Sequence, residues 1–124
     1  IYRVPCNEEI TELRYKLQTK SFQNAMLFYH IEDYRAAVIS FKNTLKDYPE
    51  VENKDEIEYL IVKSAYLYAK YSIDEKKEER YKAVFEEFNE FSSNHNEKNV
   101  YYKPAKEYFL KAQKELEKHQ QKNI

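Results

Sequence analysis

The stretch "YRAAVISFKNTLKDYP", residues 34–49, carries the clearest helical pattern in the chain. Its apolar residues recur every three or four positions, a spacing that places their side chains on one face of an α-helix. Ala37 puts a small side chain in the middle of that face, between Tyr34 and Phe41. Pro49 closes the segment, because proline disfavours helical geometry in the residue before it. The stretch therefore predicts one helix with an apolar face, ending at about residue 48.

The same periodicity extends over nearly the whole sequence and predicts an all-α protein of about five helices. The expected helices are 8–30, 33–48, one that starts after residue 53, 78–91 and 100–119. Asn53, with Glu56 three residues later, resembles a capping box at the start of the third helix. The charged segment 72–79 is expected to be a connector or a frayed helix start. Pro104 falls in the first turns of the last helix, where a missing N–H costs least.

Composition argues against several classes of function. Charged residues make up 35% of the chain and nearly cancel to a net charge of -1, whereas a dedicated nucleic-acid binder needs a basic surplus. The chain has no glycine, which P-loops, dinucleotide-binding turns and nucleophile elbows require for close backbone approach or positive φ. Its 13 tyrosines suit half-buried helix faces and contact surfaces, because a tyrosine buries its ring and keeps its hydroxyl wet.

No group of residues suggests catalysis, a cofactor or a metal, so a non-enzymatic protein is predicted. Cys6 is the only cysteine; it cannot form an internal disulfide and has no evident histidine partner that would make it a nucleophile. The histidines are dispersed, without cysteine or carboxylate at metal-ligand spacing: His30, His95 and His119. One helix face is acidic and is interpreted as solvated; it carries Glu86, Glu87 and Glu90.

The chain contains an internal repeat of helix pairs. Small residues recur at a spacing of 40, followed three positions later by aromatic ones; they are Ala25, Ala65 and Ala105, with Phe28, Tyr68 and Tyr108. The second helices match at a spacing of 47, where Tyr34, Val38 and Phe41 correspond to Tyr81, Phe85 and Phe88. The difference, 47 − 40 = 7, places an insertion near residues 72–78.

This pattern resembles the tetratricopeptide repeat, in which small residues let the two helices of a pair approach and aromatic rings fill the space around them. The first pair has all the expected positions in register: Ala25, Phe28, Tyr34, Ala37, Phe41 and Pro49. The second pair is degenerate, with Val84 at the small position and Asn96 where proline is expected. Glu32 stands where a glycine is common.

The expected architecture is therefore a tetratricopeptide-like helix-pair repeat array, an α-solenoid, forming one domain over 1–124. Its parts are an N-terminal extension (1–7), a first repeat with a long linking helix (8–49), a second, degenerate repeat (53–91) and a C-terminal capping helix (100–119).

Over residues 10–119 the chain also resembles the C-terminal half of the BamD family of outer-membrane β-barrel assembly lipoproteins, most closely its Bacteroidetes-type members. The likeness is carried by "LRYKLQTKSFQNAMLFYHIEDYRAAVISFKNTLKDYP" and, in the second pair, "KEERYKAVFEEFNEF". The resemblance implies a scaffold at the periplasmic face of the outer membrane, whose signal peptide and lipid anchor are expected upstream of this chain. "RVPC" around Cys6 does not read as a lipobox, because small residues should precede the cysteine.

The resemblance further implies protein partners: the periplasmic domains of the barrel-forming subunit, accessory lipoproteins and, as a further class, unfolded outer-membrane proteins. The alternative interpretation is a generic tetratricopeptide module that binds peptides or serves as a co-chaperone in another pathway.

In tetratricopeptide arrays the first helix of each pair lines the concave surface, so its exposed residues are the predicted partner-binding residues. By register these are Phe22, Met26, Tyr29, His30, Tyr59, Val62, Tyr66 and Lys70. Aromatic side chains with charges at the edge suit a peptide from a partner. The competing interpretation is that these side chains pack against the next helix, as apolar stripes usually do.

Overall fold

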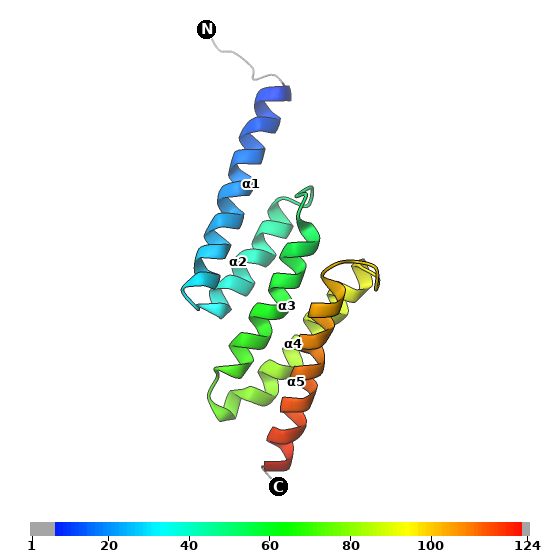
Figure 1. Cartoon of the computed structure of the whole chain (residues 1–124). Helices are drawn as coiled ribbons and strands as arrows, with labels where there is room; N and C mark the ends of the chain where they lie inside the picture. Colours follow the sequence, from blue (N-terminus) through cyan, green and yellow to red (C-terminus); the bar gives the residue numbers. More distant parts are fainter. Residues whose placement is uncertain (1–6, 123–124) are drawn as a thin grey trace.

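The computed structural model describes residues 7–122, and every regular element in this range is an α-helix. The helices are α1 (Asn7–His30), α2 (Tyr34–Asp47), α3 (Lys54–Lys70), α4 (Asp74–Asn94) and α5 (Tyr102–Lys122) (Figure 1). The predicted all-α array of five helices is therefore confirmed. The predicted extension 1–7, with Cys6, lies outside the described residues except at Asn7, where α1 begins.

Consecutive helices alternate in direction and pack side by side, and α3 also packs along α5 (Figure 1). Helix α3 thus has neighbours in α2, α4 and α5, which explains why it holds more buried residues than any other described helix. The first half of α1 projects past the end of α2 (Figure 1). Its apolar stripe is accordingly exposed, with Ile10, Leu13 and Leu17 at 50%, 59% and 46%.

Two buried clusters hold the array together. The first joins α1, α2 and α3 through Ala25, Ala37, Phe41 and residues of α3 such as Ile57 and Ile61. The second joins α3, α4 and α5, and its buried members are Val62, Ala65, Tyr66, Ala69, Tyr81, Val84, Phe88, Phe91, Ala105, Ala112 and Leu116. Val38 and Tyr59 pack against both clusters, so the core runs continuously along the array.

The repeat positions lie where close packing of helices needs small or compact side chains. Ala25, Ala65 and Ala105, spaced by 40, are all buried, and so is Ala37. Val84, at the degenerate position, is fully buried as well. The aromatic partners three positions after the alanines are half-buried; they are Phe28, Tyr68 and Tyr108.

Of the two alternatives expected for 72–79, a charged connector or a frayed helix start, the structure shows the helix start, because 74–79 belong to α4. Tyr71, Ser72 and Ile73 connect α3 to α4, which begins at Asp74. The helix dipole favours the acidic first turn, and exposed pairs at i,i+3 and i,i+4 support the turns that follow, including Lys77–Asp74 at 3.7 Å and Lys82–Glu78 at 3.1 Å. The insertion therefore lengthens α4. Helix α4 also continues past residue 91 to Asn94, and α5 spans Tyr102–Lys122 instead of 100–119.

The predicted capping box at Asn53 is wrong. The Asn53 side chain accepts no backbone hydrogen bond; its amide donates to the Glu56 carboxylate at 3.4 Å. The backbone N–H of Glu56 donates instead to Oδ1 of Asp55 at 2.8 Å. A true side-chain cap occurs at α2, where the N–H of Ala36 donates to Oδ1 of Asp33 at 3.2 Å.

Candidate partner-binding surface

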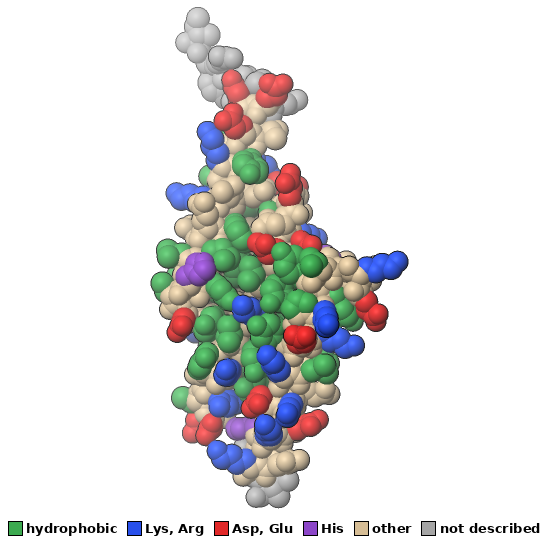
Figure 2. Space-filling model, in the orientation of Figure 1, with side chains coloured by type: hydrophobic (Ala, Val, Ile, Leu, Met, Phe, Trp, Pro, Cys, Tyr) green, Lys and Arg blue, Asp and Glu red, His purple; other side chains and the backbone are tan. Residues whose placement is uncertain are grey.

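Tyrosine and lysine side chains of α1, α3 and α5 come together on one side of the array. We call the set Tyr29, Tyr59, Lys63, Tyr108 and Lys111 the tyrosine–lysine face. Its members are joined by ring and ammonium contacts between the three helices. Figure 2, in the orientation of Figure 1, shows hydrophobic side chains gathered at the centre of the view, with basic and acidic side chains among and around them. The rings make the tyrosine–lysine face apolar, and Lys63 and Lys111 give it local positive charge.

Ring contacts between α3 and α5 build the middle of the face. Tyr59 stacks on Tyr101 with ring centroids 5.2 Å apart and lies 6.3 Å from Tyr108. Tyr66, beneath them, lies 5.3 Å from Tyr108. Burial raises the pKa of the Tyr59 hydroxyl, because a phenolate is poorly solvated there. Tyr59, Tyr101 and Tyr108 therefore present half-buried rings with fixed neighbours, and the buried Tyr66 supports them from beneath.

Lys63 is the half-buried cation of the face. Its Nζ lies 5.4 Å from the centroid of the Tyr29 ring. A side-chain hydrogen bond with Tyr29 raises the pKa of Lys63, and the nearby Tyr108 and Tyr59 hydroxyls act in the same direction. The ammonium is therefore charged at neutral pH, although no carboxylate within residues 7–122 forms an ion pair with it.

The predicted partner-binding residues differ in how far they are exposed. Tyr29 and Tyr59 lie half-buried on the face, and His30 and Lys70 are exposed. Phe22 and Met26 are also half-buried, packed against the cluster of α1, α2 and α3. Within residues 7–122, neither Phe22 nor Met26 makes a ring or cation contact with the tyrosine–lysine face.

Val62 and Tyr66 were wrongly predicted to be accessible. Val62 is fully buried and Tyr66 is 8% exposed, because both belong to the cluster that α4 and α5 complete. The Tyr66 ring packs against Tyr81 and Tyr108, with centroids 6.1 and 5.3 Å away. For these two residues, packing against the next helices is the correct interpretation.

The prediction missed Lys63, Tyr108 and Lys111. A signal for Lys63 was present, since Tyr59, Lys63 and Lys70 follow helical spacing along one side of α3. The sequence predicts Tyr108 only as the aromatic position of the repeat, three residues after Ala105. Lys111, with its Nζ 5.3 Å from the Tyr108 ring centroid, could be found only once α5 was placed beside α3.

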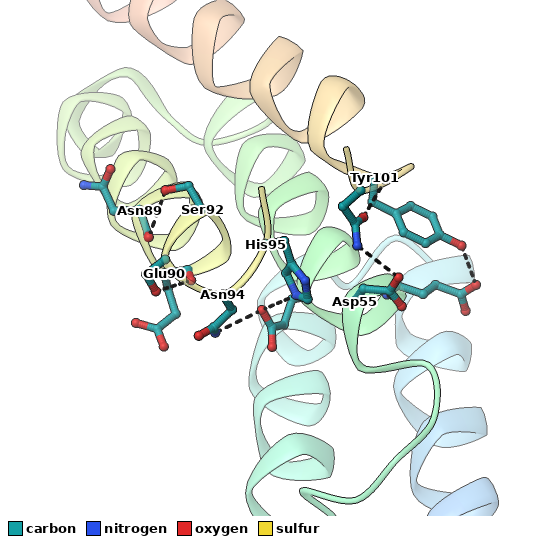
Figure 3. Close-up of polar contacts among 11 residues, drawn as sticks. Asp55, Asn89, Glu90, Ser92, Asn94, His95 and Tyr101 are labelled. Carbon is teal, nitrogen blue, oxygen red and sulfur yellow. Dashed lines mark hydrogen bonds and ion pairs between the residues drawn. The ribbon is translucent and has the colours of Figure 1, made fainter. Parts of the chain in front are cut away.

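A second polar cluster holds the loop after α4 against the first half of α3 (Figure 3). The buried Glu58 carboxylate accepts from Asn94 at 3.3 Å and lies 3.1 Å from Nε2 of His95. Tyr101 donates its hydroxyl hydrogen to Glu56 at 3.1 Å. Each carboxylate is satisfied within the protein, so this cluster fixes the start of α5 and is structural.

Within the described part of the chain, no group of three or more His, Cys, Asp or Glu side chains could hold a metal ion. The predicted acidic face on α4 is exposed at Glu86 and Glu90, whereas Glu87 is half-buried and pairs with Lys42 of α2. Between residues 7 and 122, no helix combines the length and hydropathy needed to span a bilayer.

No protein family matches the chain, and no curated protein matches it either. The function is therefore inferred from the sequence pattern and from the geometry of the tyrosine–lysine face.

Proposed function

We propose that this chain is a non-enzymatic scaffold that docks a protein partner on its tyrosine–lysine face, as a BamD-like subunit in the assembly of outer-membrane β-barrel proteins. The single observation that supports docking is the arrangement of side chains on the tyrosine–lysine face. Three helices contribute half-buried rings and ammonium groups to one surface. Tyrosine is enriched at protein interfaces because its ring supplies contact area and its hydroxyl a hydrogen bond.

The array is suited to docking because α3 is held on three sides and its rings have fixed neighbours. A surface whose side chains are already ordered loses less entropy when a partner binds. The face also lies across three helices instead of one, so a partner segment crossing it would contact each of them. This favours a peptide-like segment or a small domain over a small molecule.

The identity of the partners comes from the resemblance to BamD over residues 10–119. They would be the periplasmic domains of the barrel-forming subunit and accessory lipoproteins, with unfolded outer-membrane proteins as a further class. Residence at the periplasmic face of the outer membrane, through a lipid anchor outside this chain, belongs to the same proposal.

Site-specific photo-crosslinking tests it. A photoreactive amino acid would replace Lys111 in the full-length protein in its native membrane, and crosslinked proteins would be identified by mass spectrometry. Asn43, exposed on α2, is the matched control position. We expect position 111 to capture the barrel-forming subunit or an accessory lipoprotein, and position 43 not to. Capture of cytoplasmic chaperones or clients at position 111 would favour the generic tetratricopeptide module and contradict the outer-membrane role.

A further inference from the structure

Lys63 is the half-buried lysine of residues 7–122 that has no carboxylate partner; the other lysines without one are exposed, namely Lys20, Lys46, Lys54, Lys70, Lys98, Lys103, Lys106, Lys111, Lys114 and Lys122. Lys63, Lys70 and Lys111 each lie over a tyrosine ring, with Nζ 5.3 to 5.4 Å from its centroid. None of the three forms an ion pair with a carboxylate of the described residues. Elsewhere, lysines that do form such pairs are Lys16, Lys42, Lys76, Lys77, Lys82 and Lys118. Lys63 and Lys111, the two lysines of the tyrosine–lysine face, are therefore among the cations that form no ion pair with a carboxylate of the described residues.

The position of Lys63 makes the missing countercharge significant. Its side chain is half-buried, and partial burial of a charge costs free energy that a ring face offsets only in part. Tyr108 is close to both lysines: it raises the pKa of Lys63, and its ring centroid lies 5.3 Å from Nζ of Lys111. Two ammonium groups therefore lie near one tyrosine.

Two carboxylates close to the face have partners within the protein. Glu56 accepts the hydroxyl hydrogen of Tyr101 at 3.1 Å, next to Tyr59. Glu115, close enough to raise the pKa of Tyr66, pairs with Lys118 at 3.9 Å. The lysines of the face can therefore pair with a carboxylate from outside the chain. Glu56 and Glu115 already place negative charge nearby, which limits how much more negative charge the face can accept.

We propose that the tyrosine–lysine face binds an acidic segment of a protein partner, with an Asp or Glu carboxylate received between Lys63 and Lys111 beside Tyr108. This inference rests on the proposed function, because it states the chemistry of the partner at the same face. The tyrosine rings would contact apolar residues next to that carboxylate. A single carboxylate among apolar groups fits beside Glu56 and Glu115 better than a polyphosphate or an anionic membrane does.

Peptide binding to the 124-residue chain tests the charge requirement. Three fluorescein-labelled peptides of about 12 residues would share a Leu- and Ser-containing framework and carry Glu, Gln or Lys at the same positions. Fluorescence anisotropy would be followed at about 50 mM and about 300 mM salt. We expect the Glu peptide to bind about tenfold or more tighter than the Gln peptide, to lose affinity at the higher salt, and the Lys peptide not to bind.

Variants locate the binding site. Lys63→Met and Lys111→Met keep the length of the side chain and remove its charge, and each should weaken the Glu peptide about tenfold. Lys63→Arg keeps the charge and should retain binding, which separates loss of charge from loss of folding. Lys82→Met is the matched control, because Lys82 lies on α4 and pairs with Glu78. Circular dichroism would confirm that each variant is folded.

Several results would overturn the acidic-partner proposal. They are equal binding of the Glu and Gln peptides, no binding of the Glu peptide at about 1 mM, unchanged affinity in Lys63→Met, or binding of phosphatidylglycerol vesicles in place of the peptide. The crosslinking experiment distinguishes this failure from that of the proposed function. If position 111 still captures the barrel-forming subunit in a Lys63→Met background, docking stands and only the acidic chemistry is wrong.

Discussion

His95, at the C-terminal end of α4, lies with its Nε2 3.1 Å from Oε2 of Glu58, a carboxylate of α3 whose side chain is 7% exposed (Figure 3). The same oxygen accepts a hydrogen bond from Asn94 at 3.3 Å. These contacts hold the end of α4 against α3, and the loop that follows leads directly into α5. Because α5 supplies Tyr108 and Lys111, the geometry of the tyrosine–lysine face depends on them.

Replacing His95 with Ala should destabilise the fold by about 2–3 kcal/mol, because it leaves a buried carboxylate with one hydrogen-bond donor fewer. The ring of His95 also packs against Phe91, 4.8 Å away between centroids. Urea unfolding followed by circular dichroism measures the change. Lys98→Ala, at an exposed position of the same loop, should alter stability by less than about 0.5 kcal/mol. Equal effects of the two substitutions would show that the Glu58 contact contributes little.

Ala37→Leu tests the close approach of α1 and α2. Ala37 and Ala25 are both fully buried in the same cluster, so three additional carbon atoms have no free volume to occupy. Overpacking of this kind costs about 1–3 kcal/mol. Asn43→Leu places the same side chain at an exposed position of α2 and serves as the control. Thermal and urea unfolding should separate the two variants; if Ala37→Leu is as stable as the parent, the repeat register is wrong.

Glu32→Gly should stabilise the protein by about 0.5–1 kcal/mol, net of the greater flexibility that glycine gives the unfolded chain. Glu32 has a φ of 64°, in the left-handed region that favours glycine. Its N–H donates to the carbonyl of Tyr29 at 3.1 Å, and the N–H of Asp33 donates to that of Phe28 at 2.9 Å. This pair of hydrogen bonds is a Schellman ending, whose left-handed residue is usually glycine.

Urea unfolding again measures the effect of Glu32→Gly. Glu52→Gly, at another exposed position outside the helices, has no positive φ to relieve and should not stabilise the fold. A loss of stability in Glu32→Gly would mean that the Glu32 side chain makes a compensating contribution.

The sequence predicted the helices and their buried small residues because both follow from local periodicity. Ala25, Ala65 and Ala105 could be placed by spacing alone, and all three are buried. Spacing does not show which equivalent positions a later helix will cover. Met26 and Tyr66 share a register position, yet Met26 is half-buried and Tyr66 is buried, because α5 packs along α3 more extensively than α3 packs along α1.

The start of α4, at Asp74 instead of about Glu78, was misplaced for a different reason. The segment after Ile73 is almost entirely charged, and its helical turns have no apolar stripe for periodicity to detect. What stabilises them is the order of charge signs, as in Asp74–Lys77 and Glu78–Lys82. Lys63 and Lys111 were missed because their significance comes from Tyr108, which is close to both only once α5 packs along α3.

Tyr81 makes the stability of the fold depend on pH in the alkaline range. Its side chain is 2% exposed, and burial, followed by the neighbouring Tyr66 and Glu115, raises its pKa to about 12. In the unfolded chain a tyrosine has a pKa of about 10. The folded protein therefore retains a proton that the unfolded chain has lost. The stabilising contribution is complete below about pH 10 and is lost as pH rises towards 12.

We expect the free energy of unfolding to fall by about 2–3 kcal/mol from this residue alone between about pH 10 and about pH 12. Tyr81→Phe removes the ionising hydroxyl and should flatten, without abolishing, the alkaline loss of stability, because burial also raises the pKa of Tyr34, Tyr59, Tyr66 and Tyr101. Urea unfolding at a series of pH values measures the slope. Tyr15→Phe, at a ring that is 60% exposed, controls for the loss of a hydroxyl. If Tyr81→Phe and the parent lose stability with the same slope, the Tyr81 hydroxyl reaches solvent and its ionisation does not oppose folding.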